Sequence, residues 1–131
     1  MAGLALDTWA FVETYFDGPR RADVERALEA ADVLVTVREV VAETFGFIVR
    51  RTARTQPAWE WWEALSASPV HVREPPLAEV RRFMASRNRA GSLSLADHAL
   101  AHTALHEHAR DVATGDAEFR AFGLIPLFAK R

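Results

Sequence analysis

The sequence predicts an α/β protein of three layers, in which a parallel five-stranded sheet lies between two layers of helices. Short apolar segments alternate with helical patterns five times along the 131 residues. These short segments look apolar throughout, as strands covered by helices on both faces are. A chain of this length suits one hydrophobic core, so we expect residues 1–131 to form a single domain.

The first two strands are joined through helical patterns. Leu4-Ala5-Leu6 is a short apolar run that predicts a buried strand. Residues 9–16 predict a helix that Asp17-Gly18-Pro19 ends, and a second helix is expected over 20–31. Val33-Leu34-Val35 predicts the next strand, so the two strands have the helical connection that parallel strands need.

The middle of the chain predicts two further helices. Residues 38–53 are strongly amphipathic, with a set of apolar residues on one face: Val37, Val41, Phe45, Ile48 and Val49. Pro57 lies near the first turn of the following helix, where proline is well tolerated. That helix carries three tryptophans, of which we expect Trp59 and Trp62 to face the core. Trp61 points elsewhere and is compatible both with exposure at an interface and with packing under neighbouring loops.

The second half of the chain continues the alternation. Strands are expected at 70–72, 112–113 and 124–127. Between them, Pro75-Pro76 opens a helix that runs to about Arg87, Ser94 starts an alanine-rich helix to about Glu107, and 117–122 form a helical turn. Residues 90–92 form a loop within the domain.

Composition excludes several classes of protein. Half of the residues are hydrophobic and 26% are charged, as in globular proteins and not in disordered ones. The net charge of −2 disfavours a protein that coats nucleic acid over its whole surface, although a local basic stripe is still compatible with it. The chain has no cysteine, which excludes disulfides and thiolate metal sites. With no apolar run long enough for a membrane span and no signal-peptide pattern, we expect a cytoplasmic protein.

Four carboxylates stand at the edges of apolar segments, where unpaired charge is costly. Asp7 ends the first strand, Asp116 follows the fourth, Glu43 lies two turns into the third helix, and Asp97 lies in the first turn of the alanine-rich helix. Ligands of open α/β sheets bind beyond the carboxyl ends of the strands. Asp7 and Asp116 are therefore expected at one sheet edge, where a divalent cation with oxygen ligands would relieve the repulsion.

Each acid also has a purely structural interpretation. Asp7 and Asp116 can cap the helices that follow them, Asp97 stands at capping-box distance from Ser94, and Glu43 can be a solvated helix acid. The helix around Asp97 is apolar nearly all round, which predicts burial and so favours a partner for this acid. By helical phase, Glu39 is expected to be a surface partner of a neighbouring arginine, which leaves Glu43 as the acid that faces the sheet.

Taken together, these segments resemble PIN-domain ribonucleases, in particular the VapC-type toxins of toxin–antitoxin pairs. The resemblance rests on motifs in order along nearly the whole chain: Leu4-Ala5-Leu6-Asp7-Thr8, Val35-Thr36, Val40-Val41-Ala42-Glu43-Thr44, Ser92-Leu93-Ser94-Leu95-Ala96-Asp97, Ala113-Thr114-Gly115-Asp116-Ala117-Glu118-Phe119 and Phe122-Gly123-Leu124-Ile125-Pro126-Leu127. Each motif is weak alone, whereas their order and spacing are specific. The basic loop Ser86-Arg87-Asn88-Arg89-Ala90 departs from the family's pattern.

The resemblance implies a fold, an activity and partners. It implies a parallel five-stranded sheet and an endoribonuclease that cleaves structured RNA such as tRNA or rRNA. It implies Mg²⁺ or Mn²⁺ held by Asp7, Glu43, Asp97 and Asp116, with a small antitoxin protein as inhibitor and a homodimer as the common assembly. Asp7 is the expected direct ligand, Glu43 the residue that orients the attacking water, and Thr114 a small polar residue beside the metal.

Basic residues and histidines complete the predicted surface. Arg50, Arg51 and Arg54 continue the Glu43 helix and are candidates for guiding RNA, as is a second cluster of Arg81, Arg82, Arg87 and Arg89. Any one of them is also compatible with an ordinary solvating role. His98, His102 and His106 form one helical stripe, which can bind Zn²⁺ or Ni²⁺ but for which we expect an exposed or subunit-facing role.

Two rival functions follow from the same residues. A PIN-like module that has lost catalysis would act as a protein-interaction or RNA-binding module, and the presence of all four acids disfavours it. A phosphatase with Asp7 as nucleophile would need a second aspartate two residues later, where this chain has Trp9.

Overall fold

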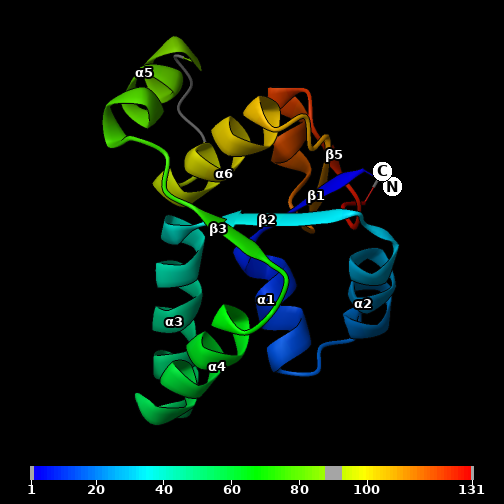
Figure 1. Cartoon of the computed structure of the whole chain (residues 1–131), viewed down its shortest axis with the longest axis vertical. Helices are drawn as coiled ribbons and strands as arrows, with labels where there is room; N and C mark the ends of the chain where they lie inside the picture. Colours follow the sequence, from blue (N-terminus) through cyan, green and yellow to red (C-terminus); the bar gives the residue numbers. More distant parts are fainter. Residues whose placement is uncertain (1, 88–92, 131) are drawn as a thin grey trace.

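The computed structural model describes residues 2–87 and 93–130, and it has the predicted three layers (Figure 1). The central layer is a five-stranded sheet of β1 (Gly3–Leu6), β2 (Val33–Val37), β3 (His71–Arg73), β4 (Asp111–Ala113) and β5 (Ile125–Pro126). The helices are α1 (Thr8–Tyr15), α2 (Arg21–Ala30), α3 (Arg38–Thr52), α4 (Gln56–Ser66), α5 (Leu77–Arg87), α6 (Leu95–His106) and the 3₁₀ helix η1 (Ala117–Phe122). Every predicted strand and helix is present, with boundaries shifted by a few residues at most.

All strands of the sheet are parallel, in the order β3-β2-β1-β4-β5. The central strand β1 pairs with β2 on one side, where Ala5 lies opposite Val35, and with β4 on the other, where Leu6 lies opposite Ala113. The chain thus winds outward from β1 in both directions. The order of the strands reverses between β1 and β4, which is the position at which such sheets bind ligands.

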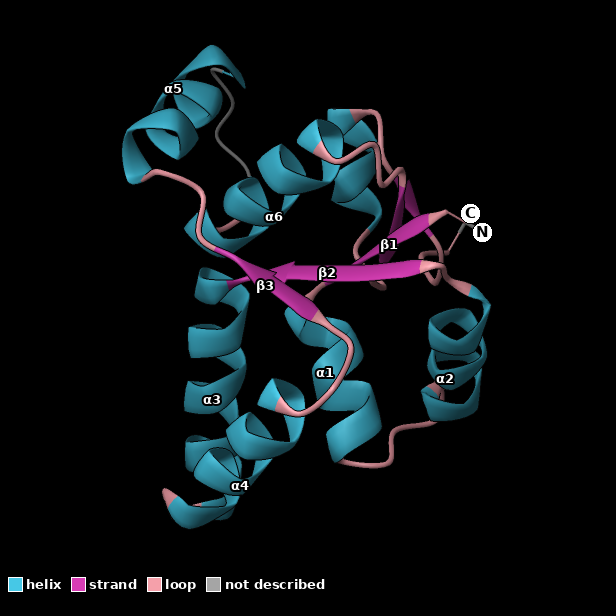
Figure 2. Cartoon of the chain, in the orientation of Figure 1, coloured by secondary structure: helices cyan, strands magenta, loops and turns pink. Residues whose placement is uncertain are grey.

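Helices cover both faces of the sheet (Figure 2). In this view α1, α2, α3 and α4 lie on one side, and α5 and α6 lie on the other. The core between these layers is aliphatic with a few aromatic side chains, and it includes Leu4, Leu6, Val35, Val40, Leu100, Val112 and Phe119. The helix α6 is buried on the side formed by Ala96, Ala99, Leu100, Ala101, Thr103 and Ala104, whereas Leu95, Leu105 and His106 are exposed, so it is less enclosed than its composition predicts.

The outer strands are less buried than their sequence predicts. His71 and Arg73 of β3 are exposed, and Ile125 of β5 is half exposed, because these strands form the two edges of the sheet. A charged residue at an edge also discourages unwanted pairing with another chain. Full coverage on both faces therefore holds for β1, β4 and the carboxyl half of β2 only.

The expected orientation in α4 is wrong for Trp59, and of the two alternatives for Trp61 the packed one is found. Trp59 is 52% exposed, whereas Trp61 packs on the core with its ring 5.5 Å from that of Phe11. Trp62 is partly buried against the core, as expected. The buried stripe of α4 begins at Ala58 and continues through Trp61, Trp62 and Leu65, and Trp59 lies about 100° away from Ala58 on the helix.

Across the two described ranges, we find no helix with the length and hydrophobicity that a membrane crossing requires.

Candidate metal centre of four carboxylates

Asp7 follows β1 at the carboxyl end of the sheet and is only 6% exposed. Its Oδ1 accepts a hydrogen bond from the backbone N–H of Thr8, at 2.8 Å, and this bond caps α1. Its Oδ2 accepts a hydrogen bond from the hydroxyl of Thr114, at 2.7 Å. These two bonds hold the carboxylate between β1 and β4.

Thr114 connects two of the predicted acids. Its side chain is fully buried just after β4, and its hydroxyl donates to Asp7 while accepting from the backbone N–H of Asp116, at 3.1 Å. Pairing of Leu6 with Ala113 sets this contact, because the residues that follow paired positions emerge side by side. The polar residue expected beside the metal is therefore the brace of the Asp7 carboxylate.

Asp116 lies in the segment that follows β4. Its Oδ1 accepts a hydrogen bond from the backbone N–H of Glu118, at 2.9 Å, and this bond caps η1. The residue before it, Gly115, packs against the indole of Trp9 in α1. A Cβ at this glycine would lie 2.9 Å from the indole Nε1, closer than real Cβ contacts are. The close approach draws the segment after β4 toward α1 and Asp7.

Asp97 lies in the first turn of α6 and forms a complete capping box with Ser94. The Ser94 hydroxyl accepts from the N–H of Asp97, and the Asp97 Oδ2 accepts from the N–H of Ser94 at 2.9 Å. Burial raises the pKa of Asp97, and the charges of Glu43 and Asp116 raise it further against the lowering effect of the Ser94 hydrogen bonds.

Burial raises the pKa of Asp7 from its ordinary value of 3.8 to about 7. The negative charges of Asp97 and Glu43 add to this rise, and the hydrogen bonds from Thr114 and Thr8 oppose it. These interactions link the four acids into one group, in which the neighbouring carboxylates raise the pKa of Asp7 and of Asp97. Strong perturbation of this kind, at the ligand-binding edge of a sheet, is typical of functional sites.

The structural interpretations of the four acids all hold. Asp7, Asp97 and Asp116 cap helices, and Glu43 is an exposed residue of α3. These roles coexist with the electrostatic coupling, because caps at the amino ends of helices point toward the same sheet edge. The sequence leaves open whether these acids are caps or site residues, and in this fold one residue can be both.

The surface role expected for Glu39 is wrong. Glu39 is partly buried, and its Oε1 is enclosed without a hydrogen-bond partner among the described residues. Its expected partner Arg38 instead pairs with Glu74, at 3.5 Å. Helical phase describes the faces of α3 but not its first turn, which other elements cover because α3 packs against both β2 and α6.

The donor set suits a hard divalent cation. Within residues 2–87 and 93–130, none of the four acids forms an ion pair, so a buried carboxylate stands among three others without a positive neighbour. The Oγ1 of Thr8 is also buried, and it has no hydrogen-bond partner among the described residues. In the sequence, only its position after Asp7 indicates this residue. Four carboxylates and a hydroxyl are the oxygen donors that Mg²⁺ or Mn²⁺ prefers.

The acids are not arranged as a closed ligand cage. In the described part of the chain, no three His, Asp or Glu side chains are grouped as the ligands of one ion. The repulsion between the carboxylates explains this, since Asp97 and Asp116 are turned toward backbone N–H groups. An ion such as Mg²⁺, which keeps several of its waters, needs only one or two direct protein ligands.

The predicted RNA-guiding arginines lie farther along α3. Arg50, Arg51 and Arg54 are exposed, and Arg50 stands seven residues beyond Glu43, or about 10 Å along the helix axis. The guanidinium of Arg51 lies 4.7 Å from the ring of Phe16 and 5.6 Å from that of Phe47. Arg50 and Arg51 thus lie in the last turn of α3 and Arg54 just beyond its end, away from Glu43 along the helix axis.

The second basic cluster is divided. Arg81 and Arg82 are exposed on α5, whereas the guanidinium of Arg87 lies near the rings of Phe83 and Phe122, at 5.0 and 4.6 Å from their centroids. Arg89 and most of the basic loop that holds it lie outside the described residues.

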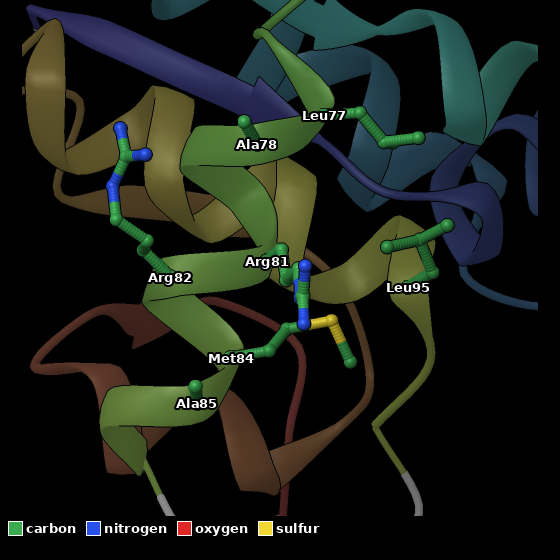
Figure 3. A pocket seen from close by; sticks show the side chains of 7 residues that line it. All are labelled: Leu77, Ala78, Arg81, Arg82, Met84, Ala85 and Leu95. Atoms are coloured by element: carbon green, nitrogen blue, oxygen red, sulfur yellow. The ribbon is translucent and has the colours of Figure 1, made fainter.

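A separate apolar groove lies on α5, with a volume of about 680 Å³. Figure 3 shows Leu77, Met84 and Leu95 directed toward the space between α5 and the start of α6, while Arg82 extends from another side of α5. Leu77 is 63% exposed and Leu95 45% exposed. Leu95 precedes Asp97 by two residues, so this apolar surface adjoins the carboxylates without containing them.

Comparisons with known proteins agree with this geometry. The profile of the PIN domain family matches residues 4–124. No curated protein matches the chain. The solved structure of VapC20 from Mycobacterium tuberculosis, a sarcin-ricin loop cleaving toxin, is 16% identical with a TM-score of 0.80, over 95% of this chain and 98% of that one.

Two further solved structures share the fold. VapBC2 from Rickettsia felis, bound to a DNA fragment from its promoter, is 16% identical with a TM-score of 0.66, over 96% of this chain and 97% of that one. PAE2754 from Pyrobaculum aerophilum is 20% identical with a TM-score of 0.59, over 99% of this chain and 91% of that one. With a family match over most of its length and the fold of VapC proteins, the chain belongs to the PIN-domain family.

Proposed function

We propose that the protein is a metal-dependent endoribonuclease, the toxin of a toxin–antitoxin pair, and that it cleaves structured RNA such as tRNA or rRNA. The observation that carries this proposal is the buried Asp7 carboxylate at the point where the strand order reverses, with Asp97 and Glu43 coupled to it and Asp116 coupled to Asp97. The family match and the fold support the same class of activity. A buried group of like charges is costly for a purely structural purpose.

Four residues form the proposed catalytic and metal-binding group: Asp7, Glu43, Asp97 and Asp116. Asp7 would hold Mg²⁺ or Mn²⁺ directly, with Thr114 fixing the orientation of its carboxylate. Asp97 and Asp116 would bind directly or through water. Bound there, the ion would lower the pKa of a coordinated water and offset charge on the scissile phosphate. Glu43 is exposed, and its carboxylate would orient the attacking water.

The RNA approaches an acidic centre, so cations nearby have to offset the repulsion of its phosphates. Arg50, Arg51 and Arg54 are the proposed contacts. They extend from the centre along α3 over a distance that a few nucleotides cover. Arg51 is held on two aromatic rings and is the most restrained of the three.

Two exposed apolar surfaces suit the proposed protein partners. Trp59 is exposed on α4 and stacks edge-on with Phe45 of α3, at 4.8 Å between ring centroids. We assign this surface to the antitoxin, because exposed tryptophan is enriched in the centres of interfaces. The groove beside Leu77 and Leu95 is on the opposite layer and is assigned to a second copy of the chain in a homodimer.

The test of the proposal is cleavage of a structured RNA by the purified chain with and without Mg²⁺. Cleavage is expected to need the metal and to disappear in Asp7→Asn, which keeps the size of the side chain and an oxygen to cap α1 but replaces the second acceptor oxygen by an NH2 group. The matched control is Asp32→Asn, an exposed aspartate at the amino end of β2, on the far edge of the sheet. Full cleavage by Asp7→Asn would remove Asp7 from the mechanism and with it the proposal.

A PIN-like module without catalysis is the alternative. It is distinguished by metal binding, because Asp7, Asp97 and Asp116 would then serve only as helix caps and Glu43 only as a solvated helix acid. Calorimetry that detects no Mg²⁺ binding at millimolar concentration, together with intact binding of a protein partner, would favour this module over the nuclease.

A further inference from the structure

A second group of metal-binding side chains lies on the outer side of α6, apart from the four carboxylates. His102 and His106 are one turn apart, and their rings stack with centroids 4.5 Å apart and an angle of 29° between the planes. Glu79 of α5 faces them, with its Oε2 3.7 Å from the Nε2 of His102. A cavity of about 530 Å³ opens beside the three side chains.

The distance between Glu79 and His102 is informative. At 3.7 Å the two atoms are too far apart for a hydrogen bond. Two ligands of one tetrahedral Zn²⁺, each about 2.0–2.1 Å from the ion, lie about 3.3 Å from each other. The observed separation is close to that value, so an ion can be placed between the two atoms with a small movement of either side chain.

His102 is prepared as a ligand by its surroundings. Its side chain is 13% exposed and packs against the ring of Phe83, and its Nδ1 is buried without a hydrogen-bond partner among the described residues. Burial lowers the pKa of His102, and the neighbouring His106 lowers it further, while Glu79 opposes the effect. The neutral imidazole that results is the form that binds metal.

The remaining histidine of the stripe has a different role. His98 binds the backbone carbonyl of Ser94 through its Nδ1, at 2.8 Å, and packs against Phe83 and Phe122. The expectation that the stripe is exposed or subunit-facing is therefore wrong for His98 and His102, which are covered by α5 and η1 of the same chain. Only His106 is exposed.

We propose that His102, His106 and Glu79 bind a transition-metal ion of the Zn²⁺ type, which links α5 to α6. Two imidazoles and a carboxylate select such an ion over Mg²⁺, which prefers oxygen ligands. The site is assembled on binding, because the stacked rings do not yet converge on one point. His106 is exposed and free to tilt toward the ion, and the fourth position is open to water through the cavity.

One neighbouring charge opposes the ion. Arg82 of α5 lines the same cavity as the three proposed ligands, and its guanidinium forms no ion pair among the described residues. A positive charge at this position weakens cation binding, because like charges repel. Arg82→Gln is therefore expected to strengthen binding of the ion, whereas replacement of any of the three ligands is expected to weaken it.

The experiment is calorimetric titration of the full chain with Zn²⁺ in the Asp7→Asn background, which impairs binding at the four carboxylates. One equivalent is expected to bind. His102→Ala and Glu79→Gln are each expected to weaken the affinity at least about tenfold, or about 1.4 kcal/mol. His71→Ala, which removes an exposed histidine from β3, is the matched control and is expected to change nothing. Circular dichroism confirms that each variant is folded.

The melting temperature provides an independent readout. Equimolar Zn²⁺ is expected to raise it in the Asp7→Asn protein but not after the further change His102→Ala, since a ligand that binds the native state alone stabilises it. Equal Zn²⁺ affinity with and without His102 would overturn the proposal, as would loss of binding in His71→Ala. Neither result depends on RNA cleavage, so the nuclease activity is tested separately.

Discussion

Replacing Asp7 by asparagine is expected to stabilise the metal-free protein while it abolishes RNA cleavage. The side chain is 6% exposed, and its pKa lies at about 7 in place of 3.8, chiefly through burial and then through the charges of Asp97 and Glu43. At 1.36 kcal/mol for each pKa unit, the ionised carboxylate costs the native state about 4 kcal/mol at pH 8. Asparagine keeps the shape and the cap of α1 without this charge.

The pH dependence has a definite sign. Because the native state holds the Asp7 proton more tightly than the unfolded chain does, this group makes stability fall as the pH rises from 3.8 to about 7. The loss is about 1.6 kcal/mol at pH 5 and about 4 kcal/mol at pH 8. The advantage of Asp7→Asn over the wild type is therefore expected to grow by about 2–3 kcal/mol between these two pH values.

Urea denaturation in the presence of a chelator measures this difference. The free energy of unfolding is determined for the wild type, Asp7→Asn and Asp32→Asn at pH 5 and pH 8. Comparison of variants at each pH cancels other groups, such as His102, whose lowered pKa makes stability rise with pH. Asp32→Asn reports the effect of removing an exposed carboxylate from the other edge of the sheet.

Two results would refute the reasoning. The first is an advantage of Asp7→Asn that is the same at both pH values, which would mean that the carboxylate does not titrate between them. The second is a variant less stable than the wild type at pH 8, which would mean that the charged form contributes to folding. Addition of Mg²⁺ is expected to narrow the gap, because the ion stabilises the wild type by binding its native state.

Three further predictions concern the residues that support Asp7 and Asp97. Thr114→Val removes the hydroxyl between Asp7 and Asp116 and is expected to cost about 1–3 kcal/mol of unfolding free energy and to reduce cleavage, whereas Thr114→Ser retains both. Ser94→Ala is expected to cost about 1 kcal/mol in urea denaturation but to keep cleavage, unlike Asp97→Asn, which should abolish it. Gly115→Ala is expected to lower the free energy of unfolding by about 1–3 kcal/mol through its contact with Trp9, and the melting temperature with it.

The outcomes that contradict these predictions are specific. Normal cleavage by Thr114→Val would show that the hydroxyl is unnecessary for holding Asp7. If Ser94→Ala lost cleavage as fully as Asp97→Asn does, Asp97 would be needed only for the capping box and not for the chemistry. An unchanged melting temperature in Gly115→Ala would mean that the indole of Trp9 moves aside at no cost.

Local patterns in the sequence were sufficient for the elements and for part of the candidate site. The alternation of apolar runs with helical patterns predicted every strand and helix, because each needs only a few neighbouring residues to define its period. The capping box of Ser94 and Asp97 and the cap at Asp7 were likewise readable, since both partners lie within four residues.

Surface assignments that depend on more than one element were less predictable. In α4, the sequence places the apolar face at Trp59, one position after Ala58, where the buried stripe begins. This shift gives Trp59 the environment that Trp61 has in the structure. The phase of α3 was nearly correct, yet Glu39 was covered by other elements in a turn where the phase predicts exposure. A helical pattern identifies the apolar face of one helix but not what lies over its ends.

The chain alone thus determined that carboxylates would stand at the ends of strands and helices, because local polarity and capping require nothing from distant residues. Only the tertiary structure decided which of them meet. Pairing of β1 with β4 brings Thr114 to Asp7 across 107 positions, and removal from water then raises the pKa of Asp7 to about 7. The packing of α5 on α6 likewise brings Glu79 to His102. Such contacts depend on strand order and helix docking, which are set by burial of the whole core and by no single segment.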